Sequence, residues 1–148
     1  RIDLPLAPIP TRAEWEEAAK RPGVEGSRAR YFLAMLEEGK EIPTTIPNYP
    51  VQTWCFGDDL AMVFLGGEVV VDYAIRVKKE FPGEDTIVAG YTNDVMSYIV
   101  SKRVLKEGGY EPVESHIYYG NPGPYTEEVE ETVMTAVKRA MEKVGRKR

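Results

Sequence analysis

A carboxylate stands where a buried strand gives way to a helix. Residues 60–65 are all apolar, which predicts a strand covered on both faces, and Gly66 and Gly67 follow it. Glu68 comes directly after the glycines. Core packing does not explain a carboxylate here, whereas ligand sites often lie at the carboxyl end of such strands. Glu68 is therefore a candidate for binding or acid–base chemistry, the alternative being that it only neutralises the following helix's N-terminus.

A second polar turn follows the next predicted strand. Residues 69–81 carry apolar positions at helical spacing, and residues 86–91 predict another buried strand. Strand, helix and strand within about 30 residues form a βαβ unit, whose two strands run parallel and end at the same edge of the sheet. This arrangement predicts that Glu68 and residues 91–94, at the ends of the two strands, face one crevice.

Residues 92–125 are polar, aromatic and rich in glycine. Apart from a short helix predicted at residues 101–107, they predict a long irregular region, and such regions often carry function. Tyrosine commonly buries its ring and bonds its hydroxyl, so simple packing of this region is the alternative for each tyrosine in it. The tyrosines of interest here and at its border are Tyr91, Tyr98, Tyr110, Tyr118 and Tyr119.

Helices and a hairpin frame this centre. The capping-box residues Thr11 and Glu14 predict a helix to Lys20, and a second helix is predicted over residues 24–38. Its inward side chains would be Tyr31, Phe32, Met35 and Leu36. Residues 51–56 and 60–65 predict a hairpin, and residues 126–144 predict a last helix with a core stripe. That stripe would consist of Val129, Val133, Val137, Met141 and Val144.

Proline divides the N-terminal part from this α/β centre. Three prolines in residues 1–10 predict an extended connector over the surface, and three more in residues 42–50 predict a loop or an edge crossing. We therefore expect two parts: residues 1–48, a proline-rich connector with a helical arm, and residues 49–148, an α/β portion. The predicted fold class is α/β, a mixed sheet with a βαβ unit packed by helices.

Composition narrows the function classes. The net charge of −5 and the pI near 5.1 argue against a nucleic-acid binder, and the basic residues of the last eleven positions fit a helix C-terminus. No apolar run reaches the length of about 18 residues that a membrane span needs. The single cysteine, Cys55, is predicted to be a buried, inert thiol. The first residue, Arg1, suggests a piece of a longer protein.

Four motifs in order resemble the C-terminal part of the catalytic domain of neutral/alkaline (non-lysosomal) ceramidases and their bacterial relatives. They are a Gly-Glu at Gly67-Glu68, a Gly-x-x-Asn-x-x-x-x-Tyr turn from Gly90 to Tyr98, a Tyr-Glu at Tyr110-Glu111 and a Tyr-Gly at Tyr119-Gly120. The resemblance covers residues 49–125. It implies a larger catalytic domain, of which residues 49–148 would be the C-terminal portion.

The resemblance also implies a site. In that family two histidines of the N-terminal part, a glutamate and a tyrosine hold a zinc ion, so Glu68 and Tyr98 would be the metal ligands here. Tyr110 would be the catalytic phenol that bonds the oxyanion, and Asn93 would shape the turn. A carboxylate suits zinc, and a divalent ion favours the ionised form of a phenol.

The departures from the family predict what must come from elsewhere. The chain has one histidine, His116, which we interpret as a loop or packing residue, and it lacks the family's nucleophilic serine segment. The chain alone should therefore be inactive. An N-terminal portion of the same protein, or a separate chain, would supply the histidines and the serine. The resemblance further suggests a lipid amide substrate of ceramide type and a secreted or periplasmic location. The competing hypothesis is a non-catalytic α/β module whose tyrosine-rich loop binds a small molecule or a protein.

Overall fold

The computed structural model describes residues 1–82 and 85–146 of the 148-residue chain and has an α/β fold. Its elements in chain order are β1 (Ile2–Pro5), α1 (Arg12–Ala18), α2 (Gly23–Glu37), β2 (Thr45–Tyr49), β3 (Val51–Phe56), β4 (Leu60–Leu65), β5 (Glu68–Val69), α3 (Val71–Glu80), β6 (Thr86–Ala89), β7 (Tyr98–Ile99), α4 (Lys102–Glu107), the π-helical turn η1 (Tyr110–Glu114), α5 (Ser115–Tyr118) and α6 (Val129–Lys143). No helix in the described ranges is long and apolar enough to cross a membrane.

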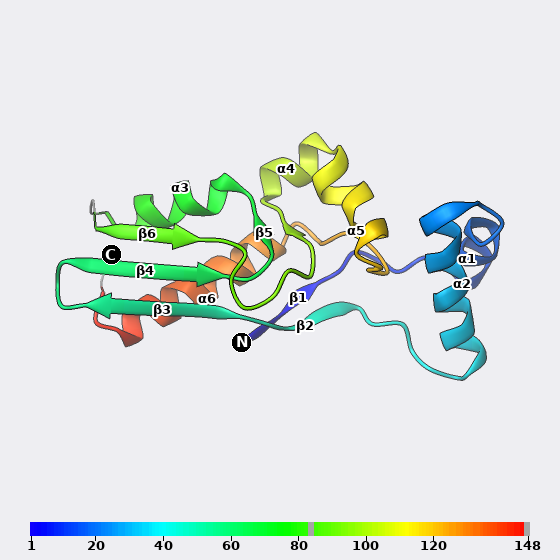
Figure 1. Cartoon of the computed structure of the whole chain (residues 1–148), viewed down its shortest axis with the longest axis horizontal. Coiled ribbons are helices and arrows are strands. Elements are labelled where there is room, and N and C mark those ends of the chain that lie inside the picture. Colours follow the sequence, from blue (N-terminus) through cyan, green and yellow to red (C-terminus); the bar gives the residue numbers. More distant parts are fainter. Residues whose placement is uncertain (83–84, 147–148) are drawn as a thin grey trace.

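A three-stranded mixed sheet in the order β3-β4-β6, here called the central sheet, occupies the left half of the view in Figure 1. β3 and β4 pair antiparallel from Val51 opposite Leu65 to Phe56 opposite Leu60, which confirms the predicted hairpin. β4 and β6 pair parallel, and α3 connects them, which confirms the predicted βαβ arrangement. Two further pairs flank this sheet, β1 with β2 antiparallel and β5 with β7 parallel.

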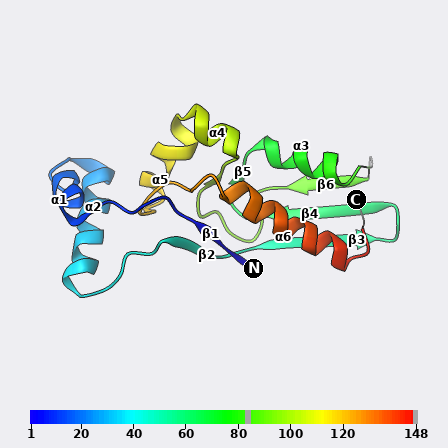
Figure 2. The ribbon, with the colours of Figure 1, turned by 180° about the vertical axis from the view of Figure 1, so that it is seen from behind.

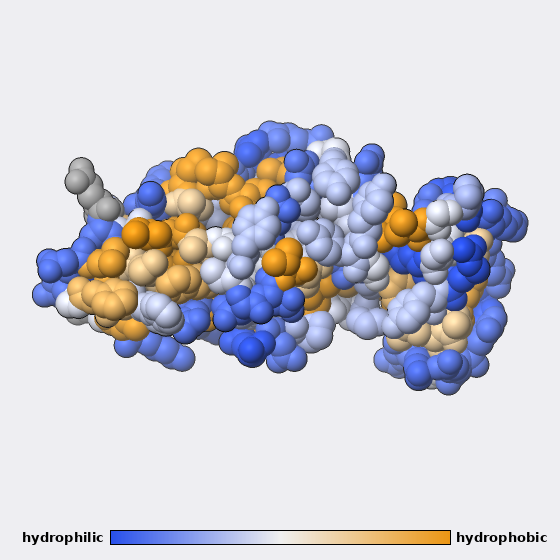
Figure 3. Space-filling model, viewed as in Figure 1, coloured by the Kyte–Doolittle hydropathy of each residue, from blue (hydrophilic) through white to orange (hydrophobic). Residues whose placement is uncertain are grey.

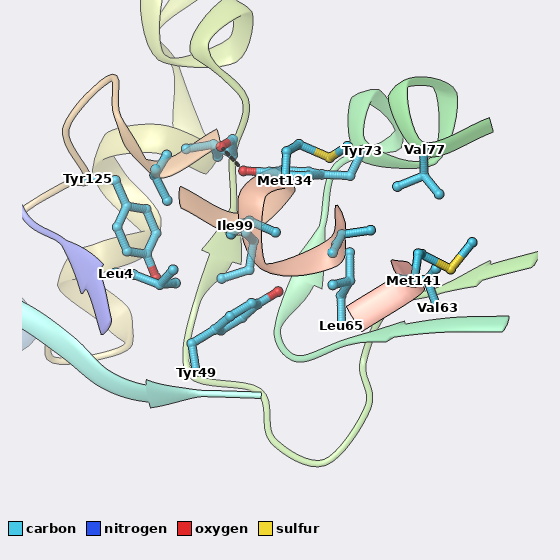
Figure 4. Packing of buried hydrophobic residues seen from close by; sticks show 14 of the residues in the cluster. Leu4, Tyr49, Val63, Leu65, Tyr73, Val77, Ile99, Tyr125, Met134 and Met141 are labelled. Atoms are coloured by element: carbon cyan, nitrogen blue, oxygen red, sulfur yellow. Dashed lines mark hydrogen bonds between the residues drawn. The ribbon is translucent and has the colours of Figure 1, made fainter. Parts of the chain in front are cut away.

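Helices α3 and α6 cover one face of the central sheet, as the two opposite views show (Figures 1 and 2). Alternate residues of β4 are buried against them, because side chains of a strand point to opposite faces. Two tyrosines in this core keep their hydroxyls bonded: Tyr49 donates to the carbonyl of Gly66 at 2.9 Å, and Tyr73 donates to that of Val100 at 3.0 Å (Figure 4). The hydrogen bond from Tyr49 therefore ties the glycine turn before Glu68 to the core.

The opposite face of the central sheet is apolar and open to solvent. Trp54 is 48% exposed, Phe56 54% and Ile87 45%, and the ring of Trp54 lies 4.7 Å from that of Phe64. A continuous hydrophobic area covers these strands in the space-filling view (Figure 3). The solvent-facing side of a mixed sheet normally carries polar side chains, so this bare apolar face is unusual.

The first residues do not run over the surface as predicted. Ile2–Pro5 forms β1, which pairs with β2, and Leu4 and Leu6 are buried in the main core. The prolines suggested a connector, but β1 has only one partner strand, so proline can occupy it without breaking a ladder on a second side. For the same reason Thr45–Tyr49, with a proline at its centre, forms strand β2 rather than a loop.

A helical arm has its own small hydrophobic cluster. Trp15, Ala29 and Phe32 are buried between α1 and α2, and the predicted capping box of Thr11 and Glu14 is present. Tyr31, predicted to face inward, is exposed instead. Phe32 is buried as predicted, and Met35 and Leu36 are partly buried against the same cluster.

Helix boundaries elsewhere differ from the predictions in informative ways. The helix predicted from residue 69 begins at Val71, because Glu68 and Val69 form a strand. The last helix runs from Val129 to Lys143, and Val144 lies beyond its end, partly exposed rather than in the core stripe. Cys55 is only partly buried.

Candidate functional site

Glu68 and Tyr98 lie opposite each other on two short parallel strands. β5 and β7 pair with Glu68 in register with Tyr98. The preceding glycine turn is tied to the segment before Tyr98, because the amide of Gly67 donates to the carbonyl of Asp94 at 2.7 Å and that of Glu68 donates to Ser97 at 2.9 Å. The two residues that the sequence singled out as ligands are thus brought together by backbone pairing.

The carboxylate of Glu68 raises the pKa of two phenols. They belong to Tyr98 and to Tyr91, the residue just beyond β6. The hydrogen bond to Glu68 is the main cause that raises the pKa of each phenol to about 12. In the part of the chain that the structure describes, no lysine, arginine or histidine forms an ion pair with Glu68.

Three further tyrosines extend this group. The ring of Tyr110 meets that of Tyr98 edge-on, with centroids 5.9 Å apart and an interplanar angle of 82°. Tyr118 lies 6.3 Å from Tyr110, measured between ring centroids. Partial burial and the charge of Glu68 raise the pKa of Tyr119, the residue that follows Tyr118. We call these five tyrosines, Tyr91, Tyr98, Tyr110, Tyr118 and Tyr119, the tyrosine cluster.

Left-handed backbone positions shape the turns at the site. Gly67 has φ of +75°, and Tyr91 and Asn93 have φ of +56° and +65°. Asparagine tolerates this conformation better than most residues, which accords with the turn-shaping role that the resemblance implies for Asn93. A tyrosine in this region is uncommon, and such positions concentrate at functional sites. The backbone at Tyr91 thus turns its phenol towards Glu68.

Sequence reasoning placed Tyr91 in the crevice with Glu68 but gave it no chemical role. Its position at the end of the predicted strand was the signal, since residues at the carboxyl ends of parallel strands tend to line ligand sites.

His116 lies in the core rather than at the carboxylate. It is fully buried, packs edge-on against Tyr125 at 4.9 Å between centroids, and has its Nδ1 3.4 Å from the amide nitrogen of Asn121. This confirms its interpretation as a packing residue. Burial, with a smaller contribution from the positive charge of Arg28, lowers the pKa of His116 to about 4.

Ser97 links this buried region to the site. The hydroxyls of Ser97 and Tyr125 lie 2.5 Å apart, and the Ser97 hydroxyl also donates to the carbonyl of Tyr98 at 2.9 Å. Tyr125 in turn carries the edge-on contact with His116. The packing around His116 therefore supports the backbone of Tyr98 from inside.

Grooves elsewhere do not contain the candidate ligands. One of about 820 Å³ lies between β3, α6 and the start of β1, and is lined by residues such as Thr53, Thr132 and Arg139. A smaller one of about 290 Å³ lies beside the tyrosine cluster and is lined by Val24, Ile117 and Tyr118 among others. Volume alone does not mark the site, because the larger groove lacks the paired carboxylate and phenols described above.

The donor set suits part of a zinc site. A carboxylate and a phenol are both oxygen donors, and they lie together without a basic partner in residues 1–82 and 85–146. Within those same ranges no group of three or more His, Cys, Asp and Glu side chains could hold a metal ion. A catalytic zinc needs three protein ligands and an open position, so Glu68 and Tyr98 would form half of such a site.

In comparisons with family models, curated protein sequences and solved structures, nothing matches the chain.

Proposed function

We propose that the chain is the C-terminal portion of a zinc-dependent, ceramidase-like amidase that hydrolyses an N-acyl amide of ceramide type. The observation that carries this proposal is the pairing of Glu68 with Tyr98 on adjacent parallel strands, where the carboxylate is near enough to raise the pKa of the phenol. The ring of Tyr110 against that of Tyr98 adds the third residue of the motif set at the same place.

Each of the candidate residues would have a separate role in the reaction. Glu68 and Tyr98 would hold the zinc ion together with two histidines from the N-terminal portion. When bound, the ion would polarise the amide carbonyl and lower the pKa of a nucleophile. Tyr110 would donate a hydrogen bond to the negative oxygen that develops on the carbonyl. Tyr91 would keep its hydrogen bond to Glu68 and so fix the orientation of that ligand. The serine or water that attacks would come from outside this chain.

The bare face of the central sheet supports a larger catalytic domain. Trp54, Phe56 and Ile87 would be covered by a further layer, as the faces of parallel sheets normally are. An N-terminal portion of the same protein, or a separate chain, is the proposed partner.

Removal of either proposed ligand should weaken zinc binding. Zinc affinity is measured by calorimetry for the chain alone and for the chain with the N-terminal portion, first as wild type and then with Glu68→Ala and Tyr98→Phe. We expect each substitution to weaken binding about 10- to 100-fold or more, because each removes a ligand or its supporting bond. Glu114→Ala and Tyr31→Phe change an exposed carboxylate and an exposed phenol elsewhere, and should leave the affinity unchanged. Tight zinc binding indifferent to both site substitutions would refute the ligand assignment.

Zinc affinity should also rise with pH. The phenol of Tyr98, with a pKa of about 12, is protonated at neutral pH and must lose its proton to bind the metal. Each unit of pH should therefore strengthen binding by up to about tenfold. Calorimetry between pH 7.5 and 8.5, above the ordinary pKa of histidine, in buffers of different ionisation enthalpy should show one proton released per zinc. Tyr98→Phe should abolish this release, and an unchanged release in that variant would contradict coordination by Tyr98.

The exposed rings favour one second candidate function, a non-catalytic module that binds a ligand through the tyrosine cluster. Tyr91 is 60% exposed and Tyr118 65%, which leaves aromatic surface available to a partner. A monomeric chain that folds alone and takes no metal in any combination would favour this function over the amidase.

A further inference from the structure

We propose that the tyrosine cluster and Glu68 form a binding site for an organic ammonium ion. The site needs no metal, so the inference goes beyond the proposed amidase function and stands or falls separately from it.

The rings have the arrangement that an organic cation requires. A cation is attracted to an aromatic face when it lies within about 6 Å of the ring centroid. The ring centroids of Tyr98 and Tyr110 are 5.9 Å apart and the two ring planes are nearly perpendicular. The ring centroid of Tyr118 lies 6.3 Å from that of Tyr110, with an interplanar angle of 44°. One bound ammonium group can therefore contact more than one ring.

The rings are also accessible. Tyr110 is 45% exposed, and Tyr91 and Tyr118 are exposed still further. Their ring surfaces are in contact with solvent in the folded chain. A small cation can reach them without opening the core.

A fixed negative charge accompanies the rings. Glu68 lies in register with Tyr98, and no basic side chain among the described residues forms an ion pair with it. Two of the three basic residues of the neighbouring α4 have acidic partners of their own, Lys102 with Glu127 and Arg103 with Asp72 and Glu107. The combination of open aromatic faces with an unneutralised carboxylate selects a cation over an anion or a neutral ligand.

The ligand class has a source in the proposed reaction. Hydrolysis of an N-acyl amide releases an amine, which carries a positive charge at neutral pH. Such an amine is an organic ammonium ion of the class that this site would bind. Zinc and ammonium would then compete for Glu68, because both are attracted to the same carboxylate.

The site is tested by titrating the chain with choline and, separately, with its neutral isostere 3,3-dimethylbutan-1-ol. The chain is kept free of metal by a chelator. Binding is followed by NMR through the ring signals of the tyrosines during titration. We expect choline to shift the signals of Tyr98 and Tyr110 with an affinity at least tenfold higher than the isostere. Tyr110→Leu should weaken choline binding by about tenfold, since it removes the aromatic face and keeps an apolar side chain. Tyr110→Phe should retain most of the affinity, and Glu68→Gln should reduce it.

Several outcomes would overturn the inference. One is equal affinity for choline and its isostere. Another is the absence of choline binding up to about 50 mM, a concentration that would detect a dissociation constant in the millimolar range. The third is an unchanged affinity for choline in Tyr110→Leu. Tyr31→Leu, at an exposed tyrosine of the helical arm, is the matched control and should have no effect. Failure of the amidase proposal would leave choline binding intact, whereas failure of this inference would leave zinc binding intact, so the two are distinguishable.

Discussion

Replacement of Gly67 by alanine should lower the free energy of unfolding by about 2 to 5 kcal/mol. Gly67 has φ of +75°, a conformation that costs an L-residue about 1 to 2 kcal/mol. A Cβ at this position would lie 2.7 Å from Cγ1 of Ile99 and 2.8 Å from the carbonyl oxygen of Ser97. Ile99 is fully buried and the Ser97 oxygen is backbone, so neither can move away freely, and such overpacking adds about 1 to 3 kcal/mol.

Gly57→Ala provides the matched control for this prediction. Gly57 also has positive φ, at +57°, but a Cβ there would meet nothing within 4 Å. It should cost only the conformational part, about 1 to 2 kcal/mol. Urea unfolding curves of both variants measure the difference. Equal losses in the two variants would show that close packing between the glycine turn and β7 contributes nothing.

Acid should destabilise the chain through His116. In the unfolded chain the imidazole has its ordinary pKa of 6.5, whereas burial, helped by Arg28, lowers the pKa in the folded chain to about 4. Between these two values the unfolded state binds a proton that the folded state does not bind. Stability is therefore fully present above pH 6.5 and falls as the pH decreases to about 4, by about 3 kcal/mol in all.

The free energy of unfolding as a function of pH measures this effect. Between pH 6.5 and 5 the slope attributable to His116 should approach about 1.4 kcal/mol per pH unit. Carboxylates with lowered pKa, such as Asp72 and Glu80, contribute mainly below this window. His116→Gln should remove the slope between pH 5 and 6.5, although it will also change stability at neutral pH. A slope that survives the substitution would contradict the assignment.

The sequence predicted what depends on regular patterns. Alternation and apolar runs located the hairpin of β3 and β4 and the parallel pair of β4 and β6, because strand patterns are read directly from residues that pack on one or two faces. It also placed Glu68 at a strand end beside a second turn. That Tyr98 lies opposite Glu68 followed from the family resemblance and not from periodicity, since β5 and β7 have only two residues each.

The open sheet face and the structure of residues 110–118 depend on contacts between distant residues, which a local sequence pattern does not predict. The six apolar residues of β4 predicted burial on both faces, yet one face of the sheet is open, because nothing in the described residues packs on it. Residues 110–118 belong to the region that was predicted to be irregular. In the structure they form a π-helical turn and a short helix. The ring contacts of Tyr110 with Tyr98 and Tyr118 arise from that turn and could not be predicted from spacing.

The positions of the two tryptophans give the chain a useful optical property. Each of its two tryptophans lies in a different setting: Trp15 is enclosed in the cluster of the helical arm, and Trp54 lies half-exposed beside Phe64 on the bare sheet face. Emission at short wavelengths therefore comes mainly from the arm, and quenchers dissolved in water reach mainly the sheet. A single chain without any added label thus reports separately on the packing of its arm and on whatever approaches its sheet.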